Sequence, residues 1–154
     1  MKLDVILKIL KRKLEKNPDG IGCDAQYYRI SKGIGVKLYW YKTLRCTTYE
    51  AQKRVYDYGK RVGKQFAPKL GRKIDIETKD GMMYGYITQH CEVNPKRTRP
   101  YADDLEFSEE YEKLIEELHQ HSIEIGDLHE FNIGYLRDKP IVIDFDWINW
   151  CPLA

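Results

Sequence analysis

The amino-acid sequence predicts an α+β fold in which an antiparallel sheet occupies the first part of the chain. Four runs rich in aromatic and β-branched residues, which favour strands, form two neighbouring pairs: residues 25 to 31 with 34 to 41, and 72 to 77 with 82 to 88. Lys32 and Gly33 separate the first pair, and Asp80-Gly81 is a strong hairpin signal in the second. Apolar residues recur at helical spacing between these pairs and on both sides of them, which predicts three helices.

The first helix covers the basic N-terminus. Its apolar residues recur at helical spacing among lysines and arginines: Leu3, Val5, Ile6, Ile9, Leu10 and Leu14. Such a helix can contact a membrane, but packing against the protein's own sheet is the more common use of an apolar stripe. The second helix should start at about Thr48 and end before Pro68, because apolar residues recur there at helical spacing: Ala51, Val55, Tyr58, Val62 and Phe66. Thr47 and Glu50 also have the spacing of a capping box, in which Glu50 would serve the start of the helix.

The last third of the chain should add a loop, a helix and a hairpin. Residues 94 to 104 contain two prolines and no periodicity, so we expect a loop there. Ser108 should cap the third helix, whose glutamates at the start suit the helix dipole. Residues 133 to 136 and 141 to 145 should pair as short strands. We expect residues 1–92, which include the amphipathic helix, to form a complete small N-terminal lobe, and residues 93–154 to form a truncated C-terminal lobe.

The composition is that of a globular protein. With 154 residues, of which 42% are hydrophobic and 32% charged, the chain can form one compact domain or two small lobes that share a cleft. It lacks the run of about 18 apolar residues that a membrane helix needs, and its start has no signal-peptide pattern. We therefore expect a soluble, cytoplasmic protein that does not enter a membrane. Its four cysteines include no C-x-x-C pair, which argues against a zinc site or a disulfide framework.

Charge is unevenly distributed along the chain. Residues 101 to 154 hold 14 of the 24 acidic residues but only three of the 26 lysines and arginines. A basic first part suits anions such as nucleotide phosphates or nucleic acid, and an acidic last part can hold a cation. Two solvated surfaces would show the same asymmetry. Nucleic-acid binding remains an alternative because tyrosines and a tryptophan accompany the basic residues, although aromatic residues on strands more often belong to a core.

Residues able to coordinate a metal ion follow the third helix. The segment Gly126-Asp127-Leu128-His129-Glu130-Phe131-Asn132 is separated by eleven residues from Asp144-Phe145-Asp146. Asp and Asn are also ordinary residues of turns and strand ends. Their carboxylate and amide oxygens are, however, the hard ligands that Mg²⁺ prefers.

This arrangement resembles the catalytic loop and metal-binding motif of protein kinases and related small-molecule kinases. The shared features are D-x-x-x-x-N, a short hairpin, and an apolar strand that ends in Asp-Phe. The resemblance implies a two-lobed fold, binding of ATP and Mg²⁺, and transfer of a phosphoryl group to a hydroxyl. It implies that Asp127 orients the attacking hydroxyl, and that Asn132 and Asp144 hold the metal ion.

The resemblance extends upstream and assigns further residues to the nucleotide. Lys37, in Gly35-Val36-Lys37-Leu38, has the position of the kinase lysine that contacts the phosphates, and Glu50 that of its ion-pair partner. Val36 and Leu38 should point to the face of the sheet opposite Lys37, so Lys37 is either a cleft residue or a solvent-facing one. Gly22 stands where kinases have a glycine-rich loop, although only two glycines occur here and a simple turn is an equal alternative. Gln89 and Cys91 follow the fourth strand, where the backbone of kinases contacts adenine. The histidines match no standard zinc spacing.

Departures from the protein-kinase pattern bear on the substrate. Gly126, His129 and Asp146 resemble the catalytic loops of aminoglycoside- and choline-kinase-like enzymes. Only eight residues follow Asp146, so we expect an abbreviated large lobe that a partner protein or a homodimer could complete. The predicted activity is transfer of the γ-phosphoryl group of ATP to a serine or threonine of a protein, including the protein itself. The alternatives are a non-catalytic kinase mimic, a small-molecule kinase and a nucleic-acid-binding protein.

Overall fold

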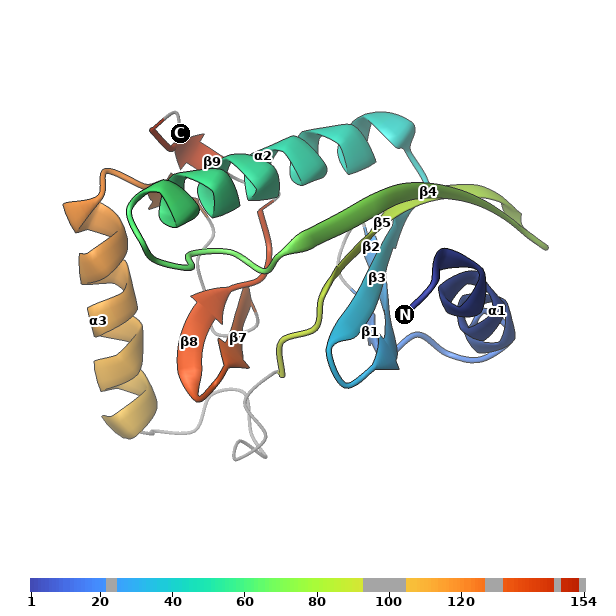
Figure 1. The fold of residues 1–154 in the computed structure, drawn as a ribbon, viewed down its shortest axis with the longest axis horizontal. Coiled ribbons are helices and arrows are strands. Elements are labelled where there is room, and N and C mark those ends of the chain that lie inside the picture. The colour runs from blue at the N-terminus through green and yellow to red at the C-terminus, as the bar shows by residue number, and fades with distance from the viewer. Residues whose placement is uncertain (22–24, 93–104, 127–131, 146–147, 153–154) are drawn as a thin grey trace. The chain divides into compact units, whose positions relative to one another are not determined.

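The computed structural model describes residues 1–21, 25–92, 105–126, 132–145 and 148–152 (Figure 1). Within them the chain forms an α+β fold, as expected from the sequence, with a five-stranded antiparallel sheet, two small two-stranded sheets and three helices. The helices are α1 (Leu3–Lys13), α2 (Lys42–Arg61) and α3 (Leu105–Gln120). The strands are β1 (Gly20–Ile21), β2 (Ala25–Ser31), β3 (Ile34–Tyr39), β4 (Leu70–Thr78), β5 (Gly81–Gln89), β6 (Glu124–Ile125), β7 (Ile133–Leu136), β8 (Lys139–Val142) and β9 (Ile148–Trp150).

The chain divides into two compact units. The first contains residues 1–49 and 69–90, and the second contains residues 50–68 and 91–154. The boundary between them falls within α2, so both units draw on segments that are distant in the sequence. The two lobes expected as residues 1–92 and 93–154 stay a prediction.

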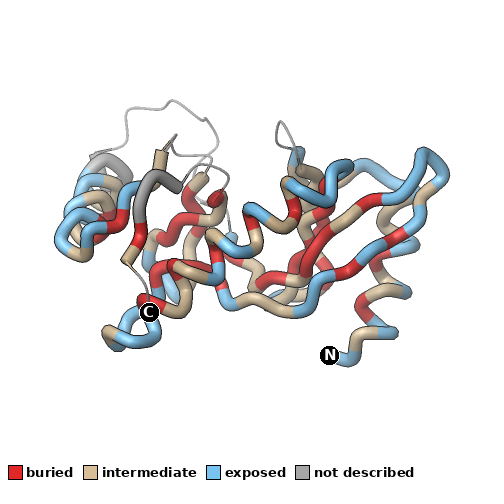
Figure 2. The backbone as a smooth tube through the Cα atoms, turned by 90° about the horizontal axis from the view of Figure 1, so that it is seen from above, coloured by how far each residue is buried: buried red, intermediate tan, exposed pale blue. Residues whose placement is uncertain are grey.

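The first unit is built on the large sheet, whose strand order is β1-β2-β3-β5-β4. Both predicted strand pairs are confirmed as antiparallel neighbours, and β3 also pairs with β5. Side chains alternate between the two faces of a strand, so one face carries an apolar set, with which Ile6 and Leu10 of α1 are buried. Figure 1 shows α1 beside the sheet, and Figure 2 shows where the backbone is buried. The predicted use of the first helix, packing against the sheet, is therefore confirmed.

The β4–β5 turn follows the Asp-Gly signal. Lys79 and Asp80 form the turn, and Gly81 opens β5 with a φ of 125°, a conformation that side chains disfavour. The Thr78 hydroxyl donates to the Gly81 carbonyl (2.8 Å), and the Asp80 amide donates to the Thr78 hydroxyl oxygen (3.2 Å). The sequence therefore predicted the place of this hairpin, whereas its register, with Thr78 opposite Gly81, comes from the structure.

The predicted start of the second helix is wrong. Helix α2 begins at Lys42, and Thr47 lies inside it with its hydroxyl donating to the Thr43 carbonyl, 2.9 Å away. Because Thr47 is not at the helix start, the capping box with Glu50 does not form. The helix ends at Arg61, before Gly63 adopts a φ of 74°, rather than running on towards Pro68.

The second unit has its own core. Buried side chains of α2, the segment after it, α3 and the C-terminal strands pack together there: Val55, Tyr58, Phe66, Ala67, Leu114, Leu118, Ile123, Ile133, Val142, Phe145 and Cys151. The predicted hairpin is confirmed as β7 and β8, although β8 ends at Val142. The predicted cap is wrong, because α3 already includes Leu105 and Ser108 lies within its first turn. The loop expected at residues 94 to 104 lies outside the described residues.

Within the described segments, no helix combines the length and apolar character that crossing a membrane requires.

Candidate functional site

Hairpin β7–β8 brings two of the predicted site residues together. Arg137 and Asp138 form its turn with φ values of 52° and 63°, and from there the strands pair back to Ile133 opposite Val142. One step further, the carbonyl of Asn132 accepts a hydrogen bond of 2.8 Å from the amide of Ile143. Asp144 follows directly, so the backbones of Asn132 and Asp144 are neighbours at the open end of the hairpin.

The residues beside this pair are anchored in the core. Ile133 follows Asn132 and is 1% exposed, and Phe145 follows Asp144 and is fully buried. Asn132 and Asp144 themselves are partly exposed. The Asp-Phe dipeptide thus has a physical basis, because the phenylalanine holds the backbone while the carboxylate stays within reach of solvent.

The donor set fits Mg²⁺. A carboxylate and a side-chain amide oxygen are hard ligands that satisfy one or two positions of an octahedral ion and leave the others to water and phosphate. Among the described residues, no group of three His, Cys, Asp or Glu side chains is placed to hold a metal ion. Asp127, the predicted catalytic base, lies outside the described residues, and its role stays a prediction.

Lys37 lies in the first unit, in the middle of β3. Tyr27 on one side and Tyr86 on the other are its partners in the sheet. Its sequence neighbours Val36 and Leu38 are fully buried under α1, which places Lys37 on the opposite face and leaves it partly exposed. The predicted orientation of Lys37, away from the face that carries Val36 and Leu38, is therefore confirmed.

Four other residues were predicted to contact the nucleotide or its lysine: Glu50, Gln89, Cys91 and Gly22. Glu50 is exposed on α2, and its ion pair with Lys37 stays a prediction. Gln89 ends β5, where its amide donates to the Lys69 carbonyl (2.8 Å) and its side-chain oxygen accepts from the Lys69 amide (3.1 Å). Cys91 is 6% exposed and belongs to the second unit. Gly22 lies outside the described residues.

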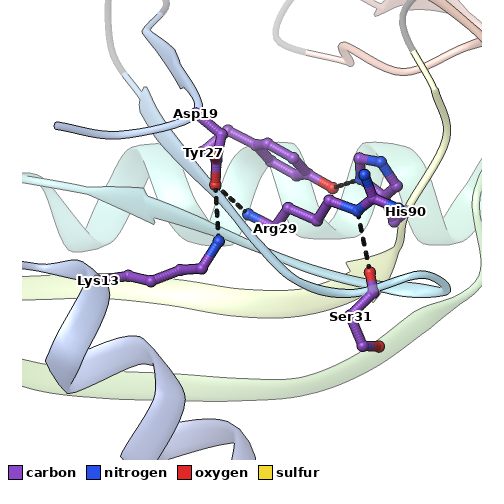
Figure 3. A network of polar contacts seen from close by, with 6 residues as sticks. All are labelled: Lys13, Asp19, Tyr27, Arg29, Ser31 and His90. Carbon is purple, nitrogen blue, oxygen red and sulfur yellow. Dashed lines mark hydrogen bonds and ion pairs between the residues drawn. The ribbon is translucent and has the colours of Figure 1, made fainter. Parts of the chain in front are cut away.

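A polar network on the large sheet was not predicted (Figure 3). Tyr27 and His90 share a hydrogen bond of 2.5 Å between the phenol oxygen and Nδ1, and their rings stack with centroids 5.7 Å apart. Sequence patterns link neither residue to the other, because His90 lies in the segment after the fourth predicted strand and matches no standard zinc spacing, and Tyr27 lies in the first predicted strand. Predicting the contact between Tyr27 and His90 would have required the exact register of β2, β3 and β5, because β3 lies between the strands that carry these two residues to one another.

The same network ties α1 to the sheet through Asp19. Its carboxylate accepts from the Arg29 amide (2.7 Å) and from the Lys13 ammonium group (3.3 Å) (Figure 3). The hydrogen bond from the Arg29 amide, assisted by Lys13, lowers the pKa of Asp19 below its ordinary value. The ionised carboxylate of Asp19 therefore connects Lys13, at the end of α1, to Arg29 in β2.

Comparison with known proteins adds no family assignment. No model of a known protein family matches the chain, and no curated protein sequence matches it.

Proposed function

We propose that this protein is an ATP-dependent phosphotransferase with a two-lobed, protein-kinase-like fold. The observation that supports the proposal best is the β7–β8 hairpin, which makes Asn132 and Asp144 neighbours although eleven residues separate them in the sequence. A metal ligand pair at the open end of such a hairpin, next to an anchoring phenylalanine, is the arrangement that the sequence motif predicts. The antiparallel sheet with Lys37 on the face opposite α1 is compatible with a phosphate-binding lysine.

Each residue has one task in the proposed reaction. Asp127 accepts the proton of the attacking hydroxyl, whose oxygen forms a bond to the γ-phosphorus as the bond to the β,γ-bridging oxygen breaks and ADP leaves. Asn132 and Asp144 hold Mg²⁺, which when bound neutralises charge on the phosphates. Lys37 contacts the α and β phosphates. The acceptor we propose is a serine or threonine of a protein, either a partner or a second copy of this chain, in the cytoplasm.

Isotope transfer tests the proposal. Purified protein is incubated with γ-labelled ATP and Mg²⁺, with and without a mixture of candidate protein substrates, beside Asp127→Ala and Asp144→Ala variants. We expect labelled phosphoserine or phosphothreonine from the wild type. Each variant should lose about 100-fold or more, since general-base catalysis contributes about 100- to 10,000-fold and even indirect perturbation of a metal ligand costs about 10- to 100-fold. Nucleotide affinity is measured in parallel by calorimetry, with and without Mg²⁺.

A matched control separates loss of chemistry from loss of folding. Glu112→Ala removes an exposed carboxylate of α3, in the same compact unit as Asp144, and should leave transfer unchanged. Thermal unfolding is recorded for every variant. Absence of both nucleotide binding and label transfer in the wild type would refute the proposal, whereas Mg²⁺-dependent binding without transfer would identify a non-catalytic kinase mimic.

A further inference from the structure

The side chain of Tyr27 lies over Gly35. A Cβ atom placed on Gly35 would meet the Tyr27 phenol oxygen at 1.9 Å and its ring carbons at 2.4 and 2.7 Å. Tyr27 stands opposite Lys37 in the strand register, so its ring leans along β3 from Lys37 towards Gly35. Only a residue without a side chain at position 35 allows this placement.

The phenol of Tyr27 is held at the far end by His90. The His90 amide donates to the Gly33 carbonyl (3.1 Å), and Gln89 pairs with Ile34, so the end of β5 runs beside the start of β3. The hydrogen bond to Nδ1 and the ring stacking, with an interplanar angle of 22°, fix Tyr27 against this end (Figure 3). All these contacts lie within the first compact unit.

Tyr27 and His90 occupy the path that a bound nucleotide would follow. The proposed function puts the phosphates at Lys37 and the base at the backbone that follows β5. Gly35 lies between these points, two residues from Lys37 and one from Ile34, which pairs with Gln89. Two residues of a strand span about 7 Å, comparable to the length of a ribose with its first phosphate. The base and ribose therefore need the space over Gly35 that the Tyr27 ring fills.

We propose that the Tyr27–His90 pair is an autoinhibitory gate on the nucleotide site. In the closed state the phenol bonds to His90 and covers Gly35. Nucleotide binds only when Tyr27 swings away, so the apparent affinity is the intrinsic affinity multiplied by the fraction of open molecules. This inference rests on the proposed function, because it takes Lys37 and the end of β5 as the nucleotide site.

The gate predicts that weakening the closed state tightens nucleotide binding. Tyr27→Phe removes the hydrogen bond but keeps the ring, and the net value of a neutral hydrogen bond corresponds to about a 5-fold change in an equilibrium constant. Tyr27→Ala also removes the stacked ring and should bind about 10-fold tighter or more. A tyrosine that instead supported the base would give the opposite sign.

Titration calorimetry with a non-hydrolysable Mg²⁺-ATP analogue measures these affinities on the full chain. The matched control is Tyr28→Phe, which removes the neighbouring phenol on the α1 face of the same strand, where Gln26 is its hydrogen-bond partner. Its affinity should equal that of the wild type. A Lys37→Met substitution in the Tyr27→Ala background should abolish the gain, because the opened site includes Lys37.

The outcomes distinguish failure of the gate from failure of the proposed function. Affinity that rises from a measurable value in the wild type to Tyr27→Phe to Tyr27→Ala supports the gate. Equal or weaker binding by both variants overturns the gate and leaves the phosphotransferase proposal standing. A gain that survives Lys37→Met places the nucleotide elsewhere and also overturns the gate. If no protein binds the analogue, Tyr27→Ala included, the gate and the proposed function fall together.

Discussion

Hydrogen bonds from buried Arg45 connect the start of α2 to the β4–β5 hairpin. Its Nη1 atom donates to the carbonyls of Ile74 (3.1 Å) and Gly85 (3.2 Å), which face each other across the two strands, and to the Asp75 carboxylate (2.9 Å). The guanidinium also lies over the Tyr84 ring, 5.8 Å from its centroid. One nitrogen thus connects the helix to both strands of the hairpin. Arg45→Ala should remove this connection between α2 and the hairpin.

The contacts of Arg45 determine the size of the effect. A hydrogen bond from a charged donor contributes about 1.5 to 3 kcal/mol, but a single nitrogen of Arg45 is shared among these acceptors, so each bond contributes less than that. The Asp75 side chain is 51% exposed, which limits the ion pair to about 0 to 1 kcal/mol. We expect Arg45→Ala to lower the free energy of unfolding by about 3 kcal/mol, or the thermal midpoint by about 6 to 12 °C for a chain of this size.

Thermal and urea unfolding, followed by circular dichroism, measure this loss. Asp75→Asn is the control, because it removes the half-exposed partner and leaves both carbonyl contacts in place, so it should cost less than about 1 kcal/mol. A change below about 0.5 kcal/mol for Arg45→Ala would refute the reasoning, since that is the range of surface substitutions. A loss of the same size in Asp75→Asn would show that the ion pair, rather than the carbonyls, fastens the helix.

Two further predictions concern stability. Gly85→Ala should destabilise the sheet by about 3 kcal/mol or more in urea unfolding, because the added Cβ would lie 2.2 Å from the Lys37 carbonyl oxygen. The control Gly33→Ala adds a Cβ that meets nothing within 4 Å and should be neutral. Equal urea midpoints for the two variants would contradict this prediction. The stability that Asp19 contributes is present above its ordinary pKa of 3.8 and is lost as the pH falls through its lowered pKa, because the unfolded chain then binds the proton more tightly. The gap in urea midpoint between wild type and Asp19→Asn should therefore close between about pH 6 and about pH 2, and a gap that stays constant would exclude the Arg29 amide as its cause.

The parts of the fold that the sequence predicted correctly depend on local signals. Apolar periodicity located α1, and turn residues located the β4–β5 and β7–β8 hairpins, whose strands are adjacent in the sequence. Two of the strands that were not predicted, β6 and β9, pair over a longer distance, with Glu124 opposite Trp150. The early start of α2 was hidden because Arg45 is polar yet 4% exposed, and its contacts are with residues about 30 and 40 positions away.

The candidate site was predicted in the same uneven way. Asn132 and Asp144 could be expected to be neighbours because their spacing encloses a short hairpin, which depends on local structure alone. Their role as metal ligands stays a prediction. Lys37 could be assigned to a face because Val36 and Leu38 flank it. Contacts between β2 and the end of β5, which hold Tyr27 against His90, depend on how three strands align, and residue types alone do not specify that alignment.

The alignment of β2 with β3 starts at their turn. Ser31 stands opposite Ile34, as the two intervening residues require. A regular ladder continued from this pair would place Tyr28 opposite Lys37, on the same face of the sheet. Because Tyr27 and Tyr28 are adjacent, a shift of one residue only changes which tyrosine stands opposite Lys37. Residue types therefore do not distinguish these two registers.

A β-bulge decides which tyrosine lies beside Lys37. Between Arg29 and Ser31 the register shifts by one residue, so that Tyr27 rather than Tyr28 opposes Lys37. A one-residue shift moves every side chain of the strand to the other face, which sends Tyr28 into the core under α1, 2% exposed, and brings Tyr27 over Gly35. The proposed gate therefore owes its place to one extra residue in β2.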